Sequence, residues 1–425
     1  MTAVDPLRAL WLIDHVCFDG SLHGGGRLYW NLLPAFDPAR VRVYPYFLRA
    51  SPEVRRVFAN APVPVEILDK GKYDPTALTT LASLCRRHRI DVMHLYCYAS
   101  STFGRIVGSA LGIPTVIHDF DTQIYFPYPL YLKTLDRVLA GGTGHAIAAS
   151  PMCRDYMRDV RRVPADRISW LPHAIPEERF EAAAKADRAR ERVALGLPAD
   201  AVLFCAITKL GPERGNEELL RAFARVAAER ANAQLVLVYK PTIYHKVPES
   251  YAHLEDVRDP DRMRQAIVRQ VEALGLTGRV RLVESLDDPE PWLVACDAVV
   301  APFLNERFSS VYLLEAFAYG RGVVATELGE QREVIRDGEN GLLVPPGDEQ
   351  ALAVAMTRLV DDPDLRARIG AEAARAAQRY RVSGVAAGLA DLYGGLVVRA
   401  RGPHAAFAAP APGPPNVPGR PGETR

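Results

Sequence analysis

The sequence predicts an α/β protein with two domains, each built on a parallel β-sheet covered by helices. Short apolar runs alternate with amphipathic helical patterns, and this alternation occurs twice along the chain. Apolar runs of this kind are typical of parallel strands that are buried on both faces. A chain of 425 residues is also too long for one core and suits two domains of ordinary size.

The predicted strands are short apolar runs bounded by polar or turn-forming residues. In the first half of the chain they are residues 9–14, 41–47, 65–68, 91–96, 114–120, 146–150 and 168–172. In the second half they are residues 202–208, 234–240, 279–284, 298–303, 322–326 and 341–345. Helical patterns separate these runs, as at 75–88 and 100–111.

The same alternation predicts where the domains begin and end. The first series of strands and helices gives a domain at 1–180, and the second gives a domain at 195–380. A further helical stretch covers 381–398. Residues 399–425 are rich in Pro, Ala and Gly and have no hydrophobic period, so we expect a disordered tail.

Composition excludes several classes of protein. The hydrophobic content of 48% is that of an ordinary globular protein, and the net charge of +1 gives no reason to expect nucleic-acid binding. The six cysteines are scattered without zinc or redox spacing, which predicts reduced side chains. The N-terminus is a poor signal peptide, and no run reaches the roughly 18 apolar residues that span a membrane. We therefore expect a cytoplasmic protein.

One predicted helix carries the most information about function. Ser309 and Ser310 are good N-caps, and the apolar helical run that begins at Val311 is ended by Gly320. The N–H groups of Ser310 and Val311 are expected to form an anion site after the preceding strand. Glu315 lies a little more than one turn into the helix, where its carboxylate can accept hydrogen bonds from paired hydroxyls. A ligand with an anion at the helix cap and a diol at Glu315 would be a nucleoside diphosphate, which carries a diphosphate next to a ribose.

From Val311 onward the chain resembles the retaining GT-B glycosyltransferases of the family 4 type. Their motif is Glu, seven residues and a second Glu, followed by Ala, a small-residue turn and a Val-Val strand. The segment ATELGEQREVIRDGENGLLVPPGD at 325–348 is similar to the family's next segment. The resemblance implies the GT-B fold, in which two Rossmann-like domains face a central cleft. It also implies that the helix at 381–398 crosses back onto the first domain.

The chain departs from the family motif at its first Glu. Arg307 stands eight residues before Glu315, where the family has that Glu, and Glu306 is one position away. If Arg307 contacts the donor, its guanidinium suits a phosphate or a carboxylate-bearing sugar. Alternatively, Arg307 is a loop residue and Glu306 replaces the missing carboxylate. Gly322 also replaces the usual Pro.

Two cations follow the first strand of the second domain. Lys209 and Arg214 lie in a glycine-containing loop, and a helix opens at Asn216. Fixed positive charge at the carboxyl end of a strand can neutralise a diphosphate leaving group. The family has Arg then Lys at this spacing, so the resemblance implies the same role with the residue types exchanged. The alternative is that both cations lie in a solvated loop without a ligand. The Glu315 helix in the same domain favours the diphosphate site over this alternative.

Three consecutive glycines, Gly24, Gly25 and Gly26, follow the first strand of the chain. Glycines let the backbone approach a ligand closely, and a helix predicted to begin near Arg27 offers its N-terminus to a phosphate. The same residues also suit a flexible turn. The resemblance implies that they form the family's Gly-rich loop against the donor phosphates and the acceptor.

His118 lies near the end of a predicted parallel strand, whose last residues reach the crevice of such a sheet. A histidine at such a place is commonly a structural donor. The resemblance instead implies the family's active-site histidine, which hydrogen-bonds the donor sugar or the acceptor. Asp119 and Asp121 have the spacing of a metal-binding pair. We expect no metal there, because Lys209 and Arg214 already neutralise the leaving group.

Two further features have competing structural explanations. The arginines Arg154, Arg158, Arg161 and Arg162 are interrupted by aspartates, which predicts a solvated helix face. The aromatic-rich segment at 122–135 suits either an acceptor groove or a packed loop.

Taken together, the sequence predicts a retaining glycosyltransferase that moves a sugar from a nucleotide diphosphate donor to a hydroxyl acceptor. Lys209, Arg214 and the two helix N-termini stabilise the leaving diphosphate, and Glu315 holds the ribose. No cofactor is expected, and no metal is required. The acceptor is a glycan, a lipid-linked or a small-molecule hydroxyl, and a peripheral contact with the inner face of the membrane stays open. The alternatives are a nucleotide-sugar epimerase and a catalytically silent GT-B protein that binds a sugar nucleotide or a partner.

Overall fold

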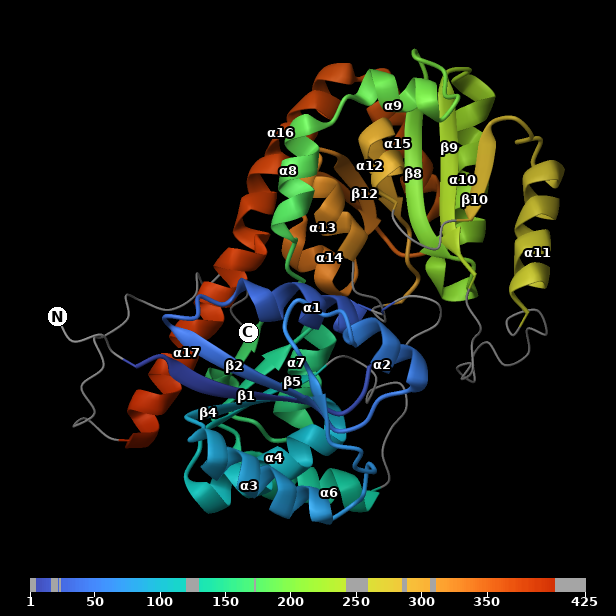
Figure 1. Ribbon diagram of the computed structural model, residues 1–425. Coiled ribbons are helices and arrows are strands. Elements are labelled where there is room, and N and C mark those ends of the chain that lie inside the picture. The colour runs from blue at the N-terminus through green and yellow to red at the C-terminus, as the bar shows by residue number, and fades with distance from the viewer. Residues whose placement is uncertain are drawn as a thin grey trace. The chain divides into compact units, whose positions relative to one another are not determined.

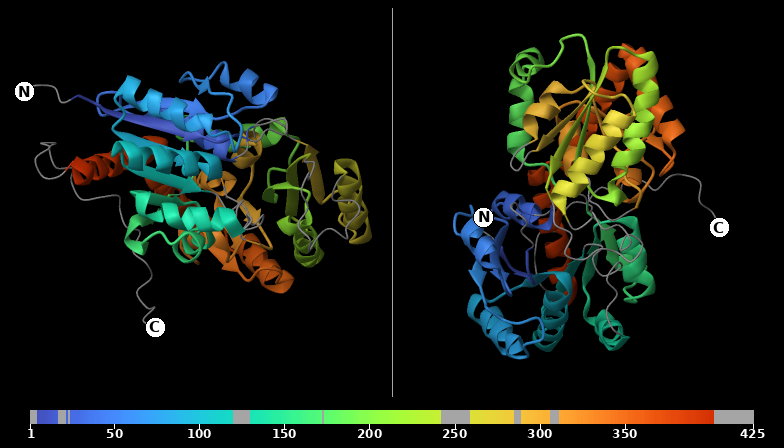
Figure 2. Two further views of the ribbon diagram at one scale, coloured as in Figure 1. Left: turned by 90° about the horizontal axis from the view of Figure 1, so that it is seen from below. Right: turned by 90° about the vertical axis from the view of Figure 1, so that its right-hand side faces the viewer.

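The computed structural model describes residues 5–16, 22, 24–119, 130–171, 173–241, 259–284, 289–305 and 311–401. These residues divide into two units (Figures 1 and 2). Unit 1 takes the described residues up to Ala174 and those from Val382 onward, and unit 2 is Ile175–Arg381. The predicted tail beyond residue 401 lies outside the described residues.

Unit 1 is a parallel β-sheet with helices on both faces (Figure 1). Its described strands lie in the order β3-β2-β1-β4-β5-β6-β7. They are β1 Leu7–Ile13, β2 Val41–Phe47, β3 Glu66–Ile67, β4 Val92–Tyr96, β5 Thr115–Asp119, β6 His145–Ala148 and β7 Ile168–Trp170. The helices are α1 Gly24–Leu32, α2 Pro52–Phe58, α3 Thr76–His88, α4 Cys97–Leu111, α6 Leu130–Val138, α7 Pro151–Asp159 and α17 Val382–Arg401.

Strand β1 shows why the strands of unit 1 read as continuous apolar runs. Trp11 and Ile13 belong to the core beneath α1 and α17. Leu10 and Leu12 belong to the core on the opposite face, beneath α3 and α4. Successive side chains of a strand point to opposite faces, so a sheet that is covered on both sides favours apolar residues at successive positions.

Helix α17 belongs to unit 1 although the chain reaches it only after unit 2. One side of it is buried in the core that also contains β1 and α1, through Val382, Val385, Ala386, Leu389, Ala390, Tyr393, Leu396 and Val397. By length and composition this helix could also cross a membrane, contrary to the prediction that no stretch qualifies. Its packing in unit 1 accounts for the apolar composition.

Unit 2 is a second parallel sheet, whose described strands lie in the order β10-β9-β8-β11-β12-β13. They are β8 Val202–Lys209, β9 Ala233–Lys240, β10 Val280–Glu284, β11 Ala298–Ala301, β12 Gly322–Thr326 and β13 Gly341–Val344. The helices are α8 Glu177–Lys185, α9 Arg188–Ala194, α10 Asn216–Glu229, α11 Pro260–Ala273, α12 Glu290–Ala295, α13 Val311–Ala318, α14 Gly329–Val334, α15 Glu349–Asp361 and α16 Pro363–Ala377. Figure 2 shows helices on both faces of this sheet.

Unit 2 begins earlier than the sequence predicts, because its first helices are tied to it by long-range contacts. The N–H of Ile175 donates to the carbonyl of Tyr380 at 2.7 Å, so the entering and leaving segments lie side by side. Arg192 on α9 donates to the carboxylate of Asp297 at 2.7 Å and to nearby backbone carbonyls. Residues 175–194 therefore belong to unit 2 rather than to the first domain and a linker.

The predicted strands are confirmed, since each overlaps an observed strand, and the helix predicted at 75–88 is α3. Helix α4 begins at Cys97 rather than at residue 100. Cys97 turns the chain with a left-handed φ of 66°, and the carboxylate of Asp14 accepts a hydrogen bond from the Ala99 N–H at 3.3 Å. Asp14 follows β1, and a cap supplied by a neighbouring strand leaves no mark in the local sequence.

Candidate active site

The strand order of unit 2 reverses between β8 and β11, and ligands of open α/β sheets bind at such a reversal, beyond the carboxyl ends of the strands. Lys209 is the last residue of β8, and Arg214 ends the short 3-10 helix that follows it. Helix α13, with Glu315, follows β11. These three predicted site residues therefore lie at the end of β8 or in the segments that follow β8 and β11, the two strands that flank the reversal.

The loop after β8 is fixed against the loop after β11. Gly215 has a φ of 66°, and a Cβ atom there would lie 1.8 Å from the carbonyl oxygen of Pro302. The N–H of Leu304 donates to the carbonyl of Glu213 at 3.0 Å. The guanidinium of Arg214 lies over the ring of Phe303, 5.1 Å from its centroid. Only glycine allows this close approach, and it determines where Arg214 lies.

Lys209 is held from the other end of the same loop. The side-chain amide of Asn216, the first residue of α10, donates to the Lys209 carbonyl at 2.8 Å. The predicted opening of a helix at Asn216 is therefore confirmed. Because this amide spans the turn, it links the end of β8 to the start of α10.

Helix α13 confirms the helix predicted after β11. It runs from Val311 to Ala318, and Gly320 has the left-handed φ of 65° expected beyond its end. Val311, predicted to bind the donor phosphate, is its first residue. The predicted caps Ser309 and Ser310, and the departures at residues 306 and 307, lie outside the described residues.

Glu315 lies in the interior of unit 2 and has a cation that nothing in the local sequence indicates. Its side chain is 1% exposed, and its Oε2 lies 3.7 Å from Nε of Arg179 on α8. Nη1 of Arg179 lies 2.6 Å from Oε2 of Glu290 on α12. A buried carboxylate requires such compensation because desolvation of its charge is costly. Arg179 is therefore a partner of the candidate site residue Glu315 that only the fold identifies.

In unit 1 the strand order reverses between β1 and β4, and the three glycines follow β1. Helix α1 begins at Gly24, so the glycines form its first turn rather than a loop ahead of a helix near Arg27. A Cβ atom at Gly26 would lie 2.6 Å from Cγ1 of Val16. Gly26 thus permits the helix to start close against the end of β1, which explains the difference in structural terms.

His118 is buried near the carboxyl end of β5, with 1% of its surface exposed. Its Nδ1 lies 3.3 Å from Nε2 of His94 on β4. Burial, and secondly the neighbouring His173, lower the pKa of His118 to about 3. The imidazole is therefore neutral near pH 7. In that state it can exchange hydrogen bonds with a sugar hydroxyl but is not a cationic acid.

Asp119 belongs to a buried ionic cluster. It pairs with Arg161, whose Nε also lies 2.5 Å from Oδ2 of Asp136. Arg161 lies beyond the end of α7 and is 1% exposed, so the predicted solvated face is wrong at this residue. The described residues contain no group of three or more His, Cys, Asp and Glu that could hold a metal. Asp121, the other member of the predicted pair, lies outside them.

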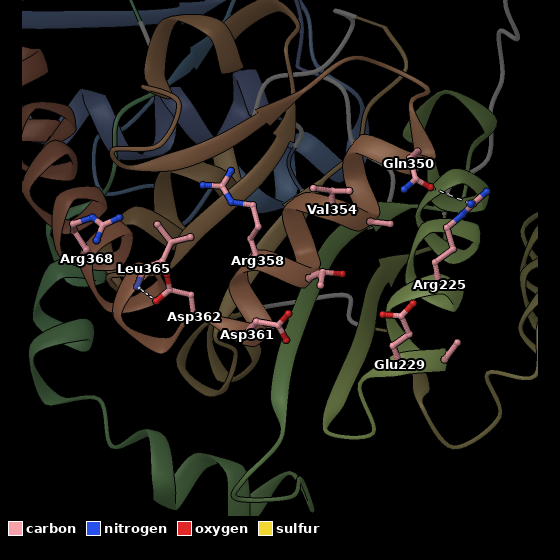
Figure 3. Close-up of a pocket in the computed structure, with 12 residues that line it drawn as sticks. Arg225, Glu229, Gln350, Val354, Arg358, Asp361, Asp362, Leu365 and Arg368 are labelled. Atoms are coloured by element: carbon pink, nitrogen blue, oxygen red, sulfur yellow. Dashed lines mark hydrogen bonds between the residues drawn. The ribbon is translucent and has the colours of Figure 1, made fainter.

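A surface groove of about 830 Å³ lies elsewhere on unit 2, along helices α10, α15 and α16 (Figure 3). Arg225 and Glu229, near the C-terminal end of α10 and so opposite its Asn216 end, line it together with Arg358, Asp361 and Arg368. Its charged side chains are exposed to solvent. None of the predicted site residues in the described part of the chain lines this groove, so we do not assign the donor site to it.

Comparisons with known proteins identify two family models that match the two halves of the chain. The family model described as Glycosyl transferases group 1 matches residues 200–362, and the model described as Glycosyltransferase Family 4 matches residues 22–179. The D-inositol 3-phosphate glycosyltransferase of Thermobispora bispora is 28% identical over 375 residues, which are 84% of this chain and 82% of that protein. The enzyme of the same name from Streptomyces bingchenggensis is 32% identical over 357 residues, 77% of this chain and 75% of that protein.

Solved structures share the fold at lower sequence identity. HepE from Anabaena has been solved in complex with UDP and in complex with UDP-glucose. These two structures have TM-scores of 0.71 and 0.66 and are 18% and 20% identical. Each comparison covers 92% of this chain and 100% of the other. The chain has two parallel sheets, and Lys209, Arg214 and Glu315 lie where the strand order of the unit 2 sheet reverses. This chain belongs to the group 1 glycosyltransferases and has their GT-B fold.

Proposed function

We propose that this glycosyltransferase moves a sugar from a nucleoside diphosphate donor to a hydroxyl acceptor with retention of configuration at the anomeric carbon. The observation that carries the proposal is the contact between the loops that follow β8 and β11. Through Gly215 and Phe303 this contact fixes Arg214 beyond the carboxyl end of β8, whose last residue is Lys209, and the Glu315 helix follows the neighbouring strand β11. Two cations and a buried carboxylate at the same reversal of strand order suit a diphosphate next to a ribose.

The proposed chemistry breaks the bond between the anomeric carbon and the diphosphate oxygen. The bonding electrons leave with the diphosphate, and Lys209 and Arg214 stabilise the negative charge that grows on it. Glu315 accepts hydrogen bonds from the ribose hydroxyls. The acceptor oxygen forms the new bond on the face that the leaving group vacates, and its proton passes to a phosphate oxygen.

Two buried carboxylates of unit 1, Asp14 and Asp119, are poorly suited to act as an inverting base, which supports retention. An inverting enzyme needs a carboxylate or another base on the face opposite the leaving group. Asp14 accepts a hydrogen bond from Nε of Arg49 at 3.0 Å, and Asp119 pairs with Arg161. A carboxylate that is paired with an arginine is a weak base, so neither is suited to that task.

The relatives suggest which substrates to test first. HepE from Anabaena was solved with UDP and with UDP-glucose, which supports a UDP-sugar as the first donor. The sequence relatives carry the name D-inositol 3-phosphate glycosyltransferase, which supports an inositol phosphate as the first acceptor.

The test combines a binding screen with product analysis. Nucleotide sugars that bind the native state should raise its thermal stability, by about 2.7 kcal/mol at a ligand concentration of 100 Kd. Each stabilising donor is then incubated with inositol 3-phosphate, and proton NMR of the product reports its anomeric configuration. An inverted product would refute retention. Isomerised free donor would favour an epimerase, and binding without turnover would favour a silent sugar-nucleotide protein.

We further propose that transfer needs no metal ion, because fixed cations supply the charge that a metal would otherwise provide. The engagement of Asp119 with Arg161 supports this proposal. Activity measured in excess EDTA should therefore equal activity in untreated enzyme. Loss of activity in EDTA that magnesium or manganese restores would contradict it and would direct attention to Asp119 and Asp121 as ligands.

A further inference from the structure

The surface groove of unit 2 lies where α10, α15 and α16 meet (Figure 3). These helices bury their apolar sides in the core of unit 2, for example through Phe223 and Met356, so the groove is formed by their remaining sides. Short side chains line it at Ala228, Ala353 and Thr357. Long side chains at these positions would fill the space between the helices, so the groove follows from the sequence of α10 and α15.

Polar contacts join α10 and α15 at both ends of the groove. Nη1 of Arg225 on α10 donates to Oε1 of Gln350, near the start of α15, at 3.1 Å. Nε and Nη2 of Arg230, directly after α10, lie 2.7 and 2.8 Å from the two carboxylate oxygens of Asp361 at the end of α15. Because the two helices also share one core, the groove is preformed and needs little reorganisation to bind a ligand.

The carboxylates that line the groove already have partners. Asp361 is bound by Arg230, whose Nη1 also lies 2.7 Å from Oε2 of Glu229. Oδ1 of Asp362 accepts a hydrogen bond from the Leu365 N–H at 2.8 Å and so caps α16. These three carboxylates are therefore compensated by a cation or by a helix N-terminus.

The arginines that line the groove lack such compensation. Arg225 contacts a neutral amide. The side chains of Arg358 on α15 and Arg368 on α16 have no hydrogen bond or ion pair within the described part of the chain, and both residues are exposed. A guanidinium group can bind a carboxylate through two parallel hydrogen bonds. The groove therefore offers uncompensated positive charge to an acidic ligand.

The arrangement of these groups favours a peptide over a small anion. Figure 3 shows Arg225 at one side of the groove, Arg368 at the other, and Val354 and Arg358 between them. Val354 is 50% exposed, which is unusual for a large apolar side chain of this protein. The stretch of α15 that lines the groove, 350–361, is about 17 Å long, which equals about five extended residues. A single phosphate would contact one part of this groove and leave Val354 uncovered.

We propose that this groove binds an acidic segment of a partner protein, whose carboxylates pair with Arg225, Arg358 and Arg368 and whose apolar side chain covers Val354. The proposal does not depend on the proposed function, because the groove contains none of the candidate active-site residues of unit 2 in the described part of the chain. The chain's own residues 402–425 do not suit the groove, since their sequence has one acidic residue, Glu423, and two arginines.

The experiment uses a fluorescein-labelled peptide with glutamates on both sides of a central leucine. Its fluorescence anisotropy is measured as the full chain is added at low ionic strength, and a peptide with glutamines in place of the glutamates is the control for charge. Arg358→Glu plus Arg368→Glu reverses two charges of the groove. Arg190→Glu plus Arg269→Glu makes the same change in net charge at two exposed arginines of α9 and α11, outside the groove. Ala228→Trp fills the groove without a change of charge.

We expect Arg358→Glu plus Arg368→Glu to raise the Kd of the acidic peptide about tenfold or more, because two attractive contacts become repulsive. Ala228→Trp should also raise the Kd about tenfold, because the bulky side chain occupies the space of the peptide. Arg190→Glu plus Arg269→Glu should leave the Kd within about twofold, since exposed charges away from the contact contribute little.

Several results would overturn the proposal. They are failure of the acidic peptide to bind, equal binding of the glutamine peptide, equal losses in the two double variants, and unchanged binding in Ala228→Trp. Displacement of the labelled peptide by inorganic phosphate as readily as by unlabelled peptide would also overturn it and would identify a site for small anions. A dimer of the chain that dissociates in Arg358→Glu plus Arg368→Glu would overturn it by identifying a second copy as the occupant.

Discussion

Lys209 and Arg214 reach the same end of the unit 2 sheet in different ways. Lys209 is a strand residue whose carbonyl is held by the Asn216 amide. Arg214 lies in a turn, where its guanidinium rests on the Phe303 ring. A planar guanidinium can stack and still donate along its edge, whereas an ammonium acts as a point charge. The exchange of the family's Arg and Lys at these positions therefore alters how each cation is supported while keeping both charges.

Replacement of both cations should remove most transfer activity. In Lys209→Ala plus Arg214→Ala, the charge that grows on the leaving diphosphate loses its fixed partners, so we expect kcat to fall about 100-fold or more. Steady-state kinetics with the donor found by the binding screen measures this loss. The matched control is Lys185→Ala plus Arg190→Ala, which removes two exposed cations of unit 2. Near-normal turnover in the first variant would exclude these residues from the mechanism.

Glu315 is a poorer choice for such a test. From the sequence alone, Glu315→Ala should abolish transfer and leave the fold intact. In the structure the carboxylate of Glu315 is only 1% exposed and pairs with Arg179. Glu315→Ala would therefore remove one of the two carboxylates that compensate the charge of Arg179. Breaking a buried ion pair costs about 3–5 kcal/mol, so an inactive Glu315→Ala variant could simply be unfolded.

The contact between the β8 and β11 loops depends on one glycine. Gly215→Ala places a Cβ atom 1.8 Å from the Pro302 oxygen and keeps a φ of 66°, which side chains rarely adopt. We expect a loss of about 3 kcal/mol or more in the free energy of unfolding, measured by urea denaturation. Gly196→Ala separates the two causes, because Gly196 has a φ of 63° and nothing within 4 Å. Its expected loss is about 1 kcal/mol, and equal losses in both variants would contradict the steric explanation.

Helix α17 should be required for the stability of unit 1. Besides its buried apolar side, Arg401 pairs with Asp91, and Nη2 of Arg40 lies 2.5 Å from Oδ1 of Asp391. A chain ending at Arg381 should therefore lose hydrogen-exchange protection in β1 and β4, while β8 and β9 keep theirs, since each unit has its own core. A chain ending at Arg401 is the control. Retained protection of β1 in the shorter chain would show that α17 is dispensable.

For the protein as a whole, buried histidines predict lower stability in mild acid. Burial lowers the pKa of His118 to about 3, and burial with further small effects lowers those of His145 and His173 to about 4. The unfolded chain binds these protons near pH 6.5 and the folded chain does not. Their stabilising contribution is therefore complete above pH 6.5 and is lost as the pH falls toward 4.

The free energy of unfolding should accordingly decrease from pH 7 to pH 5, by up to about 1.4 kcal/mol per pH unit for each histidine. Denaturation by urea at several pH values measures this slope. His145→Gln should make it shallower, because that variant removes one of the titrating groups. A free energy of unfolding that stays constant or rises between pH 7 and pH 5 would show that these histidines are accessible to protons in the folded state.

Much of this architecture follows from local sequence patterns. Hydrophobic runs and their spacing give the strands of both sheets, because a strand buried on both faces is mostly apolar along its length. The helix α13 and its end at Gly320 follow from helical periodicity and from the freedom of glycine to take a left-handed φ. The order of strands and loops also places Lys209, Arg214 and His118 near strand ends, where α/β sheets bind ligands.

Only the tertiary structure decides which distant residues meet. His94 and Tyr393 are 299 positions apart, and their hydrogen bond requires α17 to dock on unit 1. The inward turn of Arg161 toward Asp119, the capping of α4 by Asp14 and the pairing of Arg179 with Glu315 have the same origin. Local patterns reflect the solvent exposure and backbone preferences of neighbouring residues. The partner of a buried charge or hydrogen-bonding group depends instead on which elements the folded chain brings together, and that juxtaposition is absent from any single segment.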